Sequence, residues 1–100
     1  MEFTVQLNNV QDAGLFVAQC NEYAENIDYR FDHYIVDAKS LLGVISAGFN
    51  KKCIVSINTS DSVVLDKFYK DMEMWRNNIW FLLQVRLAVE KRELYLNFVK

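Results

Sequence analysis

Residues 37–48 constrain the fold of this chain more than any other segment. They read as the end of a strand, a serine that caps a helix through its side-chain oxygen, a short apolar helix and a glycine that ends it. Ser40 is the predicted cap, and Leu41, Leu42 and Ile45 form the apolar surface of the helix. One hundred residues, 52% of them hydrophobic, fit one domain with a small core.

Apolar periodicity predicts the order of the other elements. Alternating apolar residues predict strands, and apolar residues at three- and four-residue spacing predict helices. The order strand, helix, strand, strand, helix, strand, helix favours an α+β fold with an antiparallel sheet covered on one face by helices. The predicted strands are residues 2–7, 27–31, 34–36 and 53–57. The first helix is predicted over residues 10–24, and its buried face carries Ala13, Phe16, Val17, Cys20 and Ala24. Residues 63–100 contain no glycine or proline, so helix is predicted throughout them.

Charge and cysteine usage exclude several classes of function. A net charge of −2 and a pI of about 5.3 give no attraction for nucleic acid or anionic lipid. Cys20 and Cys53 lie in apolar periodic segments and are predicted to be reduced core residues, with no metal-ligand spacing. No catalytic constellation, cofactor motif, signal segment or membrane-length apolar run stands out, so we expect a non-enzymatic cytoplasmic protein.

The run DAKSLLGVISAG at residues 37–48 resembles the regulatory-serine segment of HPr, the small phosphocarrier of the bacterial sugar phosphotransferase system. The family pattern there is roughly NAKSIMGLMSLG. The resemblance covers residues 3–75 and is strongest over residues 17–48. It implies an HPr-like open-faced sandwich in residues 1–75, followed by an extended C-terminal helix in residues 76–100.

The phosphocarrier histidine of the family has no counterpart in this sequence. The family carries a pattern close to GLHARPA just before the first helix, whereas residues 8–13 here read NNVQDA. Asn9 then replaces the histidine, Gln11 the arginine and Asp12 the proline, so the resemblance implies no phosphoryl relay through this loop. His33, the single histidine, is predicted to be a polar turn residue.

The resemblance implies a regulatory site at Ser40, phosphorylated by an HPr-kinase-like enzyme, beside a docking surface formed by Lys39, Leu41, Leu42 and Ile45. Its protein partners would be a transcriptional regulator or phosphotransferase-system proteins. The alternatives are that Ser40 is only a helix cap and that some of the apolar residues fill the core.

Two other functions stay open from the sequence. One is a genuine phosphocarrier with an atypical site, and the other is a structural oligomerisation module on an HPr scaffold. The aromatic and charged C-terminal segment suggests helix association, either as a homodimer or folded back over residues 41–45.

Overall fold

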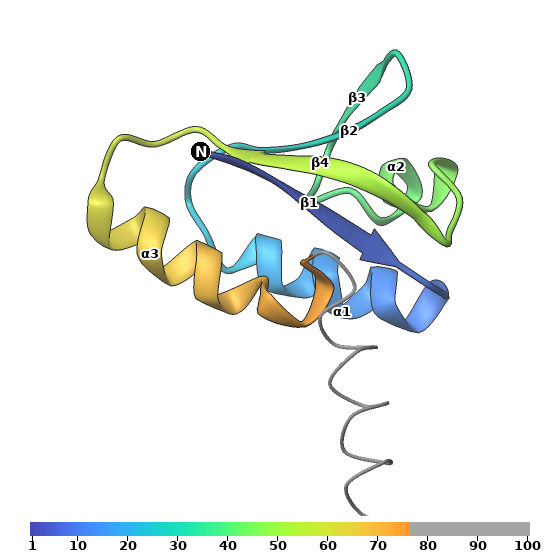
Figure 1. Ribbon diagram of the computed structural model, residues 1–100, viewed down its shortest axis with the longest axis horizontal. Helices are drawn as coiled ribbons and strands as arrows, with labels where there is room; N and C mark the ends of the chain where they lie inside the picture. The colour runs from blue at the N-terminus through green and yellow to red at the C-terminus, as the bar shows by residue number, and fades with distance from the viewer. Residues whose placement is uncertain (77–100) are drawn as a thin grey trace, which may run out of the picture.

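A four-stranded antiparallel sheet forms one layer of the structure, a computed structural model that describes residues 1–76 (Figure 1). The spatial order is β1-β4-β2-β3, so the two central strands come from opposite halves of the domain. All four strands lie where the alternation of apolar residues predicts them. Their bounds are β1 (Glu2–Leu7), β2 (Ile27–Phe31), β3 (Tyr34–Asp37) and β4 (Lys51–Ile57).

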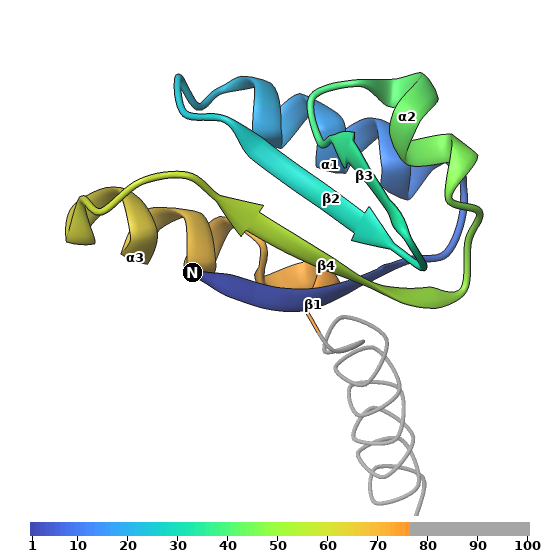
Figure 2. The ribbon, with the colours of Figure 1, turned by 90° about the horizontal axis from the view of Figure 1, so that it is seen from above.

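The helices form the second layer. α1 and α3 lie against one face of the sheet (Figure 1), whereas α2 packs against α1 and β3, beside the edge of the sheet (Figure 2). Within residues 1–76 no helix covers the opposite face. The predicted α+β architecture, an open-faced sandwich, is therefore confirmed. The helix bounds are α1 (Val10–Asn21), α2 (Leu41–Ser46), α3 (Ser62–Asp71) and the 3₁₀ turn η1 (Glu73–Trp75).

The core lies between the two layers and is built from the inward half of each strand. Ala13, Phe16, Val17 and Cys20 are buried as predicted. Ala24 is exposed, and its predicted place on the buried face is wrong, because α1 ends at Asn21 and the chain turns so that Tyr23 enters the core instead. Both cysteines are free and buried, and burial raises the pKa of the Cys20 thiol to about 12.

The predicted unbroken helix after residue 63 is wrong within the described residues. α3 ends at Asp71, η1 follows, and Arg76 is extended and bridges to Val5 of β1. Tertiary contacts explain the break, because Trp75 packs edge-on against Phe16 with ring centroids 5.5 Å apart. Residues 77–100, most of the predicted C-terminal helix, lie outside the described residues, and the domain boundary near residue 75 stays a prediction.

No helix within residues 1–76 combines the length and apolarity needed to cross a membrane.

Trp75 should stabilise the domain although it follows the last α-helix. Its side chain is 5% exposed, so Trp75→Ala should lower the free energy of unfolding by about 3–5 kcal/mol. The neighbouring Met74 is 36% exposed, and Met74→Ala is the matched control, with an expected loss of less than about 1 kcal/mol. Urea unfolding of the full chain measures both; equal losses would contradict the packing of Trp75.

Candidate functional site

Ser40 begins α2 as a helix cap, as predicted. Its backbone is extended, with φ −100° and ψ 112°, and its Oγ accepts a hydrogen bond from the Gly43 N–H at 3.2 Å. Its carbonyl accepts from the Val44 N–H at 3.0 Å, which starts the helical ladder. The residue is exposed, so the hydroxyl holds the helix start and remains accessible to solvent.

Gly43 leaves space beside the serine oxygen, a role that the sequence analysis missed. A Cβ at this position would lie 3.2 Å from Val36 Cβ and 3.3 Å from Ser40 Oγ. The close approach of α2 to β3, rather than an unusual backbone angle, therefore favours glycine at this position. Its place three residues after the capping serine is the only sequence signal for this role.

Lys39 ties the start of α2 to the end of α1. Its ammonium Nζ donates to the carbonyl oxygen of Tyr23 at 2.5 Å, and its own carbonyl accepts from Asn21 Nδ2 at 3.2 Å. The side chain is half-buried. The structure thus engages the Lys39 ammonium within the domain, whereas its predicted contact with a partner stays a prediction.

A hydrogen-bonded cluster also holds the side chain of Tyr23 in place. The Tyr23 hydroxyl donates to Asp71 Oδ2 at 2.5 Å, and Lys67 Nζ donates to the same oxygen at 2.9 Å. Burial and the hydrogen bond to Asp71 raise the pKa of Tyr23 to about 12. Burial would raise the pKa of Asp71, but the hydrogen bonds from Tyr23 and Lys67 outweigh it and lower that pKa. These contacts connect α3, α1 and the loop that carries Ser40.

The three predicted apolar contact residues of α2 divide into two groups. Leu41 is 42% exposed and Leu42 is 84% exposed, so both are available to a partner. Ile45 is half-buried and packs against the core, in agreement with the alternative that some of these residues fill the interior. On the adjoining helix α1, Val10 and Leu15 are also exposed, and the sequence analysis did not single them out.

The amino terminus of α1, where the family carries its histidine, is closed by its own side chains. Asn9 is the helix cap, and its Oδ1 accepts from the Asp12 N–H at 2.8 Å. Asp12 Oδ2 accepts from the Asn8 N–H at 3.0 Å, so a carboxylate already occupies this end of the helix. His33 is exposed in the turn between β2 and β3, and Figure 1 shows this turn on the side of the sheet away from α1.

Within residues 1–76, no group of three or more His, Cys, Asp or Glu side chains is placed to hold a metal ion.

Three solved structures that match this fold are HPr or histidine-containing phosphocarrier proteins. HPr from Bacillus anthracis str. Ames matches with a TM-score of 0.61 and 20% identity, over 76% of this chain and 96% of that protein. HPr-C-His from Thermoanaerobacter tengcongensis matches with a TM-score of 0.59 and 22% identity, over 74% and 92%. The histidine-containing phosphocarrier protein of Mycoplasma matches with a TM-score of 0.58 and 11% identity, over 74% and 92%. No family model and no curated protein matches the sequence.

These likenesses confirm the predicted HPr-like fold. At 11–22% identity they show the fold alone, and the roles of Ser40, Lys39, Leu41, Leu42 and Ile45 remain predictions.

Gly43→Ala should destabilise the domain although alanine is the better helix former. The added methyl group would press on Val36 and on Ser40 Oγ, with an expected loss of about 1–3 kcal/mol. Gly14→Ala in α1 is the matched control, because nothing lies within 4 Å of a Cβ there, and it should stabilise by up to about 1 kcal/mol. Urea unfolding tests both, and stabilisation by Gly43→Ala would contradict the close approach.

Proposed function

We propose that this chain is an HPr-like protein-binding and regulatory module that has no phosphoryl-carrier activity and is switched by phosphorylation of Ser40. The amino terminus of α1, which Asn9 and Asp12 close, carries the first part of this proposal. The exposed Ser40 hydroxyl next to the exposed Leu41 and Leu42 supports the second part.

A phosphoryl carrier of this kind needs a nucleophilic imidazole and neighbouring groups that stabilise the negative charge of the transferred phosphoryl group. Asn9 has an amide, which offers no titratable nucleophile, and its oxygen is already engaged with the Asp12 N–H. Asp12 places a negative charge at the helix end where a phosphoryl group would be bound, so charge repulsion adds to the missing nucleophile. Both features disfavour transfer to this loop.

A phosphoryl group on Ser40 would alter docking through charge and solvation. It would add about 1.5–2 negative charges at pH 7 directly beside Leu41. Gly43 has no side chain, so it leaves room next to the modified oxygen. A partner that buries Leu41 and Leu42 would have to accommodate this charge, so modification would select between partners. Those we propose are an HPr-kinase-like enzyme and a transcriptional regulator or other phosphotransferase-system proteins.

The proposed absence of phosphoryl-carrier activity predicts what happens when the histidine, arginine and proline of the family pattern are introduced before and at the start of α1. Incubation of the full chain with Enzyme I and labelled phosphoenolpyruvate should give no acid-labile phosphate. Asn9→His alone should accept little, because Asp12 still repels the incoming group. The variant N9H/Q11R/D12P should accept clearly more than N9H. Label on residues 8–14 or on His33 of the unaltered chain would contradict the proposal.

If Ser40 is a regulatory site, its phosphorylation should depend on the exposed apolar residues of α2. An HPr kinase with labelled ATP should modify Ser40, which phosphopeptide mapping would detect, and Ser40→Ala should abolish the label. Leu42→Glu should lower kcat/KM by about tenfold, because the kinase loses an apolar docking contact.

Val63→Glu is the matched control for Leu42→Glu, since Val63 is 74% exposed on α3. It should leave the rate of phosphorylation unchanged. Absence of label on Ser40 would remove the proposed switch, and equal effects of the two glutamate variants would contradict docking of the kinase through Leu42.

A further inference from the structure

The sheet face away from the helices is uncovered by residues 1–76 (Figure 1). Side chains alternate along each strand, so the residues between the buried ones point to this side. We name these outward residues the open sheet face. They are Glu2, Thr4 and Gln6 of β1, Lys52, Ile54 and Ser56 of β4, Asp28 and Arg30 of β2, and Ile35 and Asp37 of β3.

The register of the strands orders the open sheet face into a middle row, which holds both of its isoleucines, and two charged ends. Ile54 pairs with Arg30, and Arg30 pairs with Ile35, which places these three in the middle row. Ile35 is 65% exposed and Ile54 is 40% exposed. Lys52 lies two residues from Ile54 towards the β2–β3 turn, and Asp28 lies two residues from Arg30 in the other direction.

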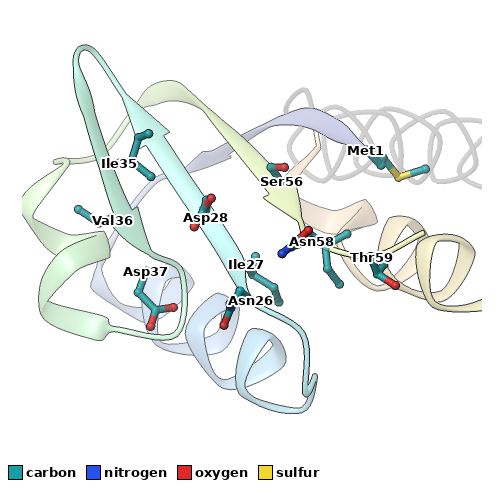
Figure 3. A pocket seen from close by; sticks show the side chains of 11 residues that line it. Met1, Asn26, Ile27, Asp28, Ile35, Val36, Asp37, Ser56, Asn58 and Thr59 are labelled. Carbon is teal, nitrogen blue, oxygen red and sulfur yellow. The ribbon is translucent and has the colours of Figure 1, made fainter. Parts of the chain in front are cut away.

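The acidic end is a hollow with two carboxylates. Asp28 and Asp37 lie directly opposite each other on β2 and β3, an arrangement that like charges disfavour. Neither forms an ion pair within residues 1–76. They line a depression of about 590 Å³ together with Ser56 and Asn58, which Figure 3 shows from the open side. Among the described residues, Arg30 of the middle row pairs with Glu2 of this end, whereas no cation pairs with Asp28 or Asp37.

The basic end has the opposite charge. Asp32 in the turn is paired with Lys51 at 3.6 Å. Lys52 is exposed and forms no ion pair within residues 1–76. It borders a second, smaller hollow of about 200 Å³. Over the part of the chain that the structure describes, Lys52 lies without an ion pair at one end of the face, and Asp28 and Asp37 lie without one at the other. The charges of the face are therefore complementary to those of a second copy of the same face.

We propose that the open sheet face binds a second copy of this chain. A two-fold axis between the sheets, running across the strands at the level of Ile54, exchanges the two ends of the face. This axis brings Lys52 of each copy over the row of the other copy that contains Asp28 and Asp37. Packed sheets are usually rotated by about 30° relative to each other, and this rotation directs Lys52 towards Asp28. Ile54 then meets Ile54 of the second copy. The helices of both copies remain outside, so the dimer presents two docking surfaces and two Ser40 residues.

A charge-reversal exchange tests this dimer with the full chain in sedimentation equilibrium experiments. The unaltered chain should form dimers, and Lys52→Glu and Asp28→Lys should each raise the dimer Kd by at least about tenfold, because each creates two like-charge contacts. An equimolar mixture of the two variants should recover the original Kd. In the mixed dimer, the introduced glutamate of one copy meets the introduced lysine of the other, and the second contact keeps its original pair, Asp28 with Lys52.

Two further variants separate the interface from folding. Asp28→Asn should stabilise the monomer to urea, since it relieves the repulsion with Asp37, and yet weaken the dimer. Lys70→Glu, an exposed position on α3, is the charge-reversal control and should leave the Kd unchanged. A monomeric unaltered chain, or a mixture that associates no better than its components, would overturn the proposal. Dimers that survive both single reversals would also overturn it, and would indicate an interface elsewhere in the chain.

Discussion

The packing of Phe16 between the two layers is the contact on which the rest of the domain depends. Its ring is fully buried and lies 5.5 Å from Tyr29 in the sheet and 5.5 Å from Trp75 beyond α3. One side chain of α1 therefore joins a central strand to the end of the described chain. Because apolar burial is the largest favourable contribution to folding, this contact sets where α1 lies, and α1 in turn positions both candidate sites.

The two ends of α1 serve different parts of the molecule. At its amino terminus, Asn9 accepts from the Asp12 N–H and Asp12 accepts from the Asn8 N–H, so the Asp12 carboxylate places a negative charge there. Just beyond its carboxy terminus, the carbonyl of Tyr23 receives the Lys39 ammonium and so steadies the loop before Ser40. A single helix thus has a carboxylate at one end and supports the loop that carries the capped, exposed Ser40 hydroxyl at the other. The loop proposed to lack carrier activity and the proposed regulatory serine therefore lie near opposite ends of the same helix.

The elements of the fold could be predicted from local patterns because those patterns record direct physical preferences. All four strands follow the alternation of apolar residues, and Ser40 caps α2 because its oxygen satisfies a helix N–H. The end of α3 could not be predicted in this way. No glycine or proline stops the helix, and the break depends on Trp75 reaching Phe16, a contact between residues far apart in the chain.

The sequence alone determined which chemistry is available: an amide at Asn9, a hydroxyl at Ser40, and apolar side chains at Leu41 and Leu42. Only the tertiary structure decided which of these side chains are accessible. It exposes Leu42, turns Ile45 towards the core and engages Lys39 with the end of α1. The reason is that side-chain identity belongs to each residue, whereas exposure and charge pairing depend on which distant segments pack beside it.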